Sequence, residues 1–237
     1  MRLPETLYCA VKHCMSGHAA WHVARLNPLP LTERERREVE RARKFFPDAI
    51  CLTNEGAGAQ FLEFHRDMVR EFKWLLLHTP EHSFSVAEWD GIPERFSQHF
   101  KPGYIEGVMA ALPPYIAGAS LEALGAFVER TERGVVKFSD IHNKCHAAIA
   151  QEEALRDPKG TRPDDADMLH WAEAPNNEHF WSLHYWIDGL YSAWQAANGL
   201  PVDVSPKRPP DHHHAEFKIS DALARRARQT FFRLDLE

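Results

Sequence analysis

The 237-residue sequence has no apolar run that approaches the roughly eighteen residues needed to span a membrane. Its first residues lack the basic flank and the apolar core of a secretory signal, so we expect a cytoplasmic protein without a membrane anchor. The net charge of -6 lacks the basic surplus that is typical of proteins that bind nucleic acid. The four cysteines include no C-x-x-C pair, which favours reduced thiols over a disulfide framework or a cysteine-rich zinc site.

The alternation of apolar and polar residues that marks β-strands is nearly absent, whereas apolar residues recur at helical spacing. This spacing predicts helices over residues 5–25, 33–45, 60–78, 104–112, 120–130, 141–155 and 179–198, and a basic helical tail from residue 220. Thr32 and Glu35 predict a capping box at the start of the second helix. We therefore expect an all-α chain that forms one domain over residues 1–237, with a core of about residues 5–198 and a C-terminal extension over 199–237.

Histidine is the residue in excess, since the chain has 15 histidines but only 12 glycines. The same pattern of histidines occurs in each half of the chain. The first half contains His18-x3-His22 and then Phe61-x3-His65, and the second half contains His142-x3-His146 and then Phe180-x3-His184. Residues four apart on a helix lie on one face, so each H-x3-H pair can direct two imidazoles at one point.

We call His18, His22 and His65 the first triad, and His142, His146 and His184 the second triad. Helix pairs that each present three histidines predict two metal ions inside an antiparallel four-helix bundle with long loops. Six neutral nitrogens without a carboxylate or thiolate suit copper better than the di-iron class. His13 is an alternative ligand, but helical geometry favours His18 and His22, which differ by about 40° around the axis, whereas His13 and His18 differ by about 140°.

Several short motifs around the histidines agree in order and spacing with one known family. Residues 142–146 resemble its H-N-x-x-H motif, residues 174–181 its P-N-D-P-x-F-W motif, and residues 184–188 its H-x-x-I-D motif. Residues 61–66 are similar to its F-L-P-W-H-R motif. The family is the tyrosinase and hemocyanin group of type-3 copper proteins, and the resemblance covers roughly residues 22–195.

The resemblance implies an oxidase that uses two copper ions and O2 to oxidise a small aromatic substrate, which is a phenol, an o-diphenol or an o-aminophenol. It implies that Asn143 helps a water molecule to deprotonate a phenol, with a carboxylate such as Glu132 or Asp140 nearby. It further implies that Asp188 pairs with Arg66 behind the metal ligands, where an oriented carboxylate tunes the imidazoles. A copper-delivery protein is a possible partner of such a site.

The first triad departs from the bacterial pattern, because no histidine lies between His22 and His65. Arthropod hemocyanins place an H-x3-H pair upstream of F-x3-H, which supports His18 and His22 as ligands; otherwise the first site holds one metal or none. Two alternatives remain open: a protein that binds O2 or copper without turnover, and a single-metal enzyme that uses only the second triad. The latter would suit zinc hydrolysis, but Asn143 occupies the place of the glutamate base in H-E-x-x-H proteases.

Overall fold

The computed structural model describes residues 2–15, 17–26, 31–80, 83–130, 139–157, 166–210 and 217–231. Within these ranges the chain is all-α, as predicted, and its extended pairing is limited to an isolated bridge between Arg2 and Asn177. The helices are α1 (Glu5–Cys14), α2 (Gly17–Ala24), α3 (Glu33–Phe45), α4 (Ala57–His78), α5 (Glu94–Ser97), α6 (Tyr104–Gly118), α7 (Leu121–Glu129), α8 (Ile141–Arg156), the 3-10 helix η2 (Ala174–Asn176), α9 (Glu178–Ala197) and α10 (Asp221–Phe231). None of these helices combines the length and apolarity needed to cross a membrane. Glu132 lies outside the described residues.

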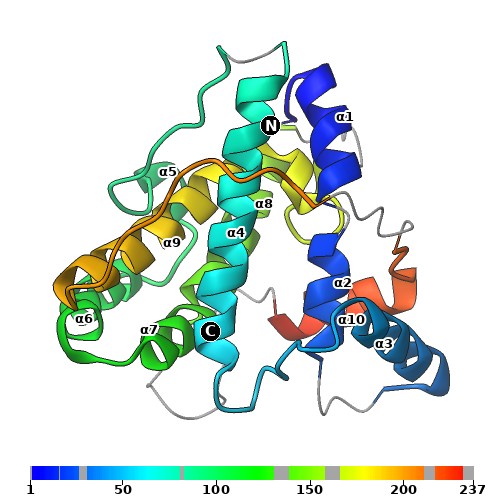
Figure 1. Ribbon diagram of the computed structural model, residues 1–237, viewed down its shortest axis with the longest axis horizontal. Helices are drawn as coiled ribbons and strands as arrows, with labels where there is room; N and C mark the ends of the chain where they lie inside the picture. The colour runs from blue at the N-terminus through cyan, green and yellow to red at the C-terminus, as the bar shows by residue number, and fades with distance from the viewer. Residues whose placement is uncertain are drawn as a thin grey trace.

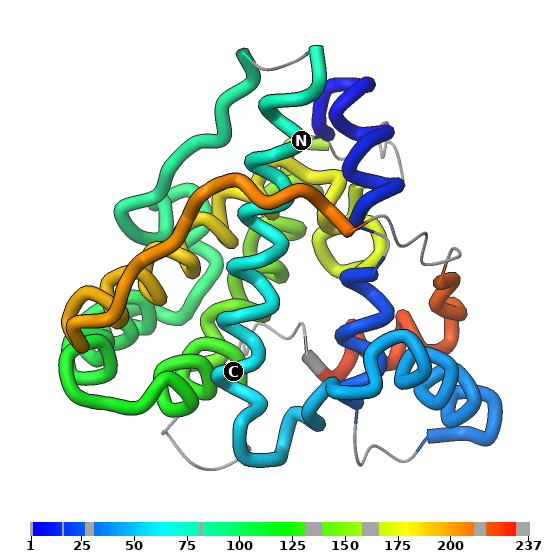
Figure 2. Tube along the Cα trace, viewed as in Figure 1, coloured from blue at the N-terminus to red at the C-terminus, as the bar shows by residue number. Residues whose placement is uncertain are grey.

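Helix α4 runs through the middle of the molecule (Figure 1). It packs against α7 and α9 on one side and against α1 on another, while α2 packs against α3. Residues 200–210 cross over α4 (Figure 2), where the Lys207 main-chain N–H donates to the Arg70 carbonyl at 3.0 Å. The long central helix therefore contacts elements from both halves of the sequence.

Two predicted helices differ from the structure. The expected helix over residues 5–25 is divided into α1, which ends at Cys14, and α2, which begins at Gly17. Only part of α1 is buried, whereas every residue of α2 is buried. The expected end near residue 112 is also wrong, because α6 continues through Pro113 and Pro114 to Gly118. Both prolines are exposed, so water can satisfy the carbonyl groups that lose their helical partners.

Other local predictions are confirmed. Thr32 accepts from the Glu35 main-chain N–H, and the Glu35 carboxylate accepts from Thr32, which completes the capping box of α3. The ends of α8 and α9 lie within a residue of those expected from apolar spacing. These features depend on neighbours along the chain, which explains why the sequence predicts them.

The apolar core consists of two neighbouring clusters. The larger one includes Phe61, Phe72 and Trp181 and joins α1, α2, α4, α5, α6, α7, α8 and α9. The smaller one joins α2 to α3 and α10. Because α2 contributes to both clusters, it is buried on all sides, and its polar side chains face other parts of the protein.

Two glycines allow α4 and α7 to approach each other at main-chain distance. A Cβ atom at Gly58 would lie 2.4 Å from the Ala126 nitrogen, and one at Gly125 would lie 1.9 Å from the Gly58 oxygen. Any other residue at either position would force the two helices apart. This close contact brings Glu129, at the end of α7, beside the end of α2.

Candidate metal centre

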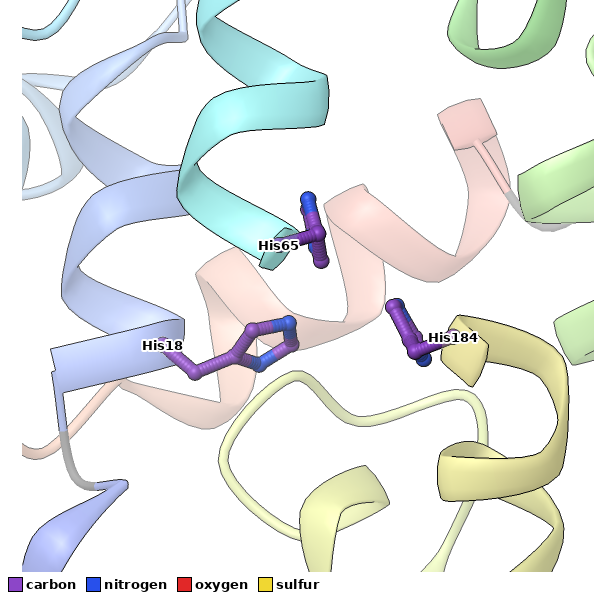
Figure 3. Close-up of side chains that lie close together, drawn as sticks. All are labelled: His18, His65 and His184. Carbon is purple, nitrogen blue, oxygen red and sulfur yellow. The ribbon is translucent and has the colours of Figure 1, made fainter. Parts of the chain in front are cut away.

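All six predicted histidine ligands meet in one buried group, which we call the histidine cluster. It consists of His18 and His22 from α2, His65 from α4, His142 and His146 from α8, and His184 from α9. None of the six is more than 6% exposed. His18, His65 and His184 point toward one another from three different helices (Figure 3). The fold therefore brings together side chains that are separated by more than 160 residues in the sequence.

The repeated F-x3-H pattern has a direct structural role in the cluster. His65 Nδ1 lies 2.8 Å from the Phe61 carbonyl oxygen, and His184 Nδ1 lies 2.7 Å from the Phe180 carbonyl oxygen. Each phenylalanine ring also packs on its histidine, with centroid distances of 4.3 and 3.9 Å. Since a carbonyl only accepts, Nδ1 carries the hydrogen and Nε2 keeps its lone pair for the interior of the cluster.

Two further histidines are oriented by carbonyl groups that the sequence did not single out. His18 Nδ1 lies 2.7 Å from the Trp171 oxygen, and His146 Nδ1 lies 2.8 Å from the Met168 oxygen. The Trp171 ring also stacks on His22 at a centroid distance of 5.1 Å. Both carbonyls belong to the connection between α8 and α9, whose contact with α2 has no local sequence signal.

The remaining nitrogens have the spacing expected of ligands that share an ion. His18 Nε2 and His22 Nε2 are 3.1 Å apart, and His142 Nε2 and His184 Nε2 are 3.3 Å apart. A tetrahedral ion with metal–nitrogen bonds of about 2.0–2.1 Å separates two of its ligands by roughly 3.3 Å. In addition, His65 Nε2 is buried and has no hydrogen-bond partner in the part of the chain that the structure describes. A metal ion would satisfy this lone pair.

Burial keeps the six imidazoles neutral. It lowers the pKa of His18 to about 4 and that of His146 to about 3. Burial also lowers the pKa of His22, His65, His142 and His184 well below 6.5, and the nearby histidines lower it further. Neutral imidazole is the form that binds a metal ion, so the cluster is ready to act as a ligand set at neutral pH.

The nitrogens of the second triad lie within 4.8 Å of one another, in the grouping that the sequence predicts. His18 and His65 of the first triad lie within the same distance of His184, so His184 belongs to both groups. His22 joins the cluster through its contact with His18. His13 lies exposed on α1, so the structure brings His18 and His22 to the cluster and leaves His13 outside it.

Asn143 lies beside the cluster, and its side-chain amide nitrogen has two hydrogen-bond partners. Its Nδ2 group donates to the Asp140 carboxylate at 2.7 Å and to the Glu129 carbonyl at 3.1 Å. The Glu129 carboxylate in turn binds Arg25 through two contacts of 2.5 and 2.9 Å. Burial raises the pKa of Glu129, while Arg25 opposes this shift. Sequence reasoning missed this buried pair, because its partners are 104 residues apart.

The predicted pairing of Asp188 with Arg66 is present. Arg66 Nε donates to the Asp188 carboxylate, and Arg66 Nη2 donates to the Asp188 carbonyl at 3.0 Å. Both side chains are buried, and burial raises the pKa of Asp188 against the opposing effect of Arg66. This pair joins α4 to α9 one turn from His184, whereas main-chain carbonyls orient the imidazole rings themselves.

No protein-family model, curated protein or solved structure matches this chain. The motifs around the second triad therefore stay a resemblance to the type-3 copper family. The geometry and chemistry of the histidine cluster are what point to a function.

Proposed function

We propose that the chain is a copper-dependent oxidase that uses O2 to oxidise phenols, o-diphenols or o-aminophenols. One observation carries this proposal: six buried, neutral imidazoles from four helices converge on one point. We further propose that α2, α4, α8 and α9 act as an antiparallel four-helix bundle around a dicopper centre within a single domain. Two bound copper ions would supply the reduction of O2, coupled to oxidation of the aromatic substrate.

Each ligand set follows from the nitrogens that are available. His184 Nε2 has one lone pair and can bind one ion, although it lies close to both groups of histidines. If it binds with His142 and His146, the first ion is left with His18, His22 and His65. The contact between His18 and His22 supports this division.

Asn143 is suited to hold a water molecule or a phenol hydroxyl. An amide has two N–H donors, and both are engaged by Asp140 and by the Glu129 carbonyl. These two bonds fix the orientation of the amide, so its Oδ1 atom can accept a hydrogen bond from a water molecule or a phenol hydroxyl. We propose that Asn143 positions the substrate hydroxyl, with Asp140 as the neighbouring carboxylate that accepts the proton.

Copper reconstitution tests the proposal. The purified chain should bind about two copper ions and the loaded protein should oxidise catechol with consumption of O2. Fewer than about one copper per chain, or no oxidation by the loaded protein, would overturn the oxidase proposal. An Asn143→Ala variant should keep its copper but lose activity toward phenols.

The burial of the cluster favours one second candidate, a protein that binds O2 or copper without turnover. All six rings are at most 6% exposed, which restricts the access of an aromatic substrate. A loaded protein whose oxygenated spectrum is unchanged by catechols would support this candidate. Burial also favours a copper-delivery protein as a partner. We propose that the protein receives its copper in the cytoplasm.

A further inference from the structure

A cavity of about 310 Å³ opens where the end of α3 and the following residues meet α4. Four aromatic residues line it: Trp21, Phe45, Phe46 and Phe64. The rings of Phe46 and Phe64 are 6.2 Å apart and nearly perpendicular. Its volume is at the lower end of the roughly 300–1,000 Å³ that is typical of small-molecule sites. The cavity therefore has the size and the walls to hold one aromatic ring.

Only one aromatic layer separates this cavity from the histidine cluster. The rings of Trp21 and Phe64 stack in parallel at a centroid distance of 4.0 Å. On the inner side, Trp21 lies 5.0 Å from His22 and 5.5 Å from His65, and Phe64 lies 5.4 Å from His65. A molecule in the cavity would contact side chains that themselves contact His22 of α2 and His65 of α4.

The charged side chains that line the cavity are all acidic. Its titratable lining residues are Asp48, Glu63 and Asp67, and none of its lining residues is cationic. Asp67 is neutralised by Lys207 at 2.5 Å and by Arg70 at 3.6 Å. Asp48 and Glu63 are exposed at the mouth, and neither carboxylate forms an ion pair within the described parts of the chain. Two carboxylates are thus available to a ligand.

The amide group that lines the cavity is already engaged. Gln60 Nε2 donates to the Asp48 carbonyl at 2.8 Å, and Gln60 Oε1 accepts from the Ile50 main-chain N–H at 2.7 Å. The polar groups that can still bind a ligand are therefore the two carboxylates, which attract a cation and repel an anion. The aromatic walls add attraction for both a ring and a positive charge.

We propose that this cavity binds a protonated arylalkylamine, with its ring against Phe46 and Phe64 and its ammonium group at Asp48 and Glu63. The use of this cavity by a substrate of the oxidase rests on the proposed function. The binding itself requires no copper, so the two proposals can fail separately.

Isothermal titration calorimetry of the metal-free full-length chain tests the binding. The probes are 2-phenylethylamine, its neutral analogue 2-phenylethanol and the anion 3-phenylpropionate. The amine should bind about tenfold or more tightly than the alcohol, and the anion should bind more weakly still. Glu63→Gln and Asp48→Asn should each weaken amine binding by about three- to fivefold, as expected for an exposed ion pair, without changing the affinity for the alcohol.

Glu40→Gln is the matched control, because Glu40 is an exposed acid on α3 that does not line the cavity. Equal affinities for amine and alcohol, absence of amine binding, or equal behaviour of the control and the two cavity variants would overturn the proposal. Copper uptake is measured on the same samples. Amine binding without copper uptake would support the cavity proposal and overturn the oxidase proposal. Copper uptake without amine binding would overturn the cavity proposal and leave the oxidase proposal standing.

Discussion

The histidine cluster predicts that the metal-free protein loses stability steeply in mild acid. Histidines of an unfolded chain titrate near about pH 6.5. In the folded protein, burial lowers the pKa of His18 to about 4 and that of His146 to about 3, and it lowers the pKa of the other four as well. Below about pH 6.5 the unfolded chain therefore binds protons that the folded chain excludes, so stability falls as the pH falls.

The size of this effect is large compared with the stability of a domain. Each excluded proton changes the free energy of unfolding by about 1.4 kcal/mol per pH unit, so six give roughly 8 kcal/mol per pH unit. Burial raises the pKa of Glu71 to about 7, which opposes the effect by about one proton. Because typical domains are stable by about 5–15 kcal/mol, we expect the metal-free protein to unfold near pH 5 to 6.

Urea unfolding followed by circular dichroism measures this dependence at a series of pH values from about 7.5 to about 5.5. A slope that corresponds to fewer than about two protons would refute the reasoning, since it would mean that the histidines are charged or accessible in the folded protein. His65→Phe preserves a ring against Phe61 and should reduce the slope by about one proton. His78→Asn, on the exposed end of the same helix, should leave the slope unchanged.

Three further predictions concern ligands and packing. His22→Ala should reduce bound copper from two ions to about one, whereas His13→Ala should not; equal copper contents after reconstitution would show that the first triad is not a site. Asp188→Ala leaves the Arg66 guanidinium buried without its carboxylate, so the free energy of unfolding should fall by about 3–5 kcal/mol in urea titrations, and a loss below about 1 kcal/mol would contradict this role. Gly125→Ala places a Cβ atom 1.9 Å from a main-chain oxygen of α4. It should destabilise the protein by about 3 kcal/mol and lower the Tm, and an unchanged Tm would contradict the close helix contact.

Local patterns in the sequence determine much of the fold. The apolar spacing predicts the helices that carry His65, His142 and His184, because helical periodicity depends only on neighbours along the chain. The pairs four residues apart place their rings on one face for the same reason. The F-x3-H pattern is also local, since each histidine reaches the carbonyl one turn before it.

Where tertiary contacts compete with local propensity, the sequence alone is insufficient. It predicts one continuous helix over residues 5–25, but packing between two apolar clusters divides it and buries α2. It also predicts that the prolines end α6, but exposure to water allows the helix to continue. Burial decides the first case and exposure to water decides the second, and both depend on how the rest of the chain packs.

By itself, therefore, the sequence determines the all-α class, the positions of most helices and the identity of the histidine pairs. Only the tertiary structure brings His18 and His22, the pair that helical geometry favours, into one buried cluster with the other four histidines. The tertiary structure also supplies the Trp171 and Met168 carbonyls that orient two rings, because such contacts join segments separated by 22 to 153 residues. No local pattern encodes these contacts, since they arise when the apolar faces of the helices pack together and exclude water from the imidazoles.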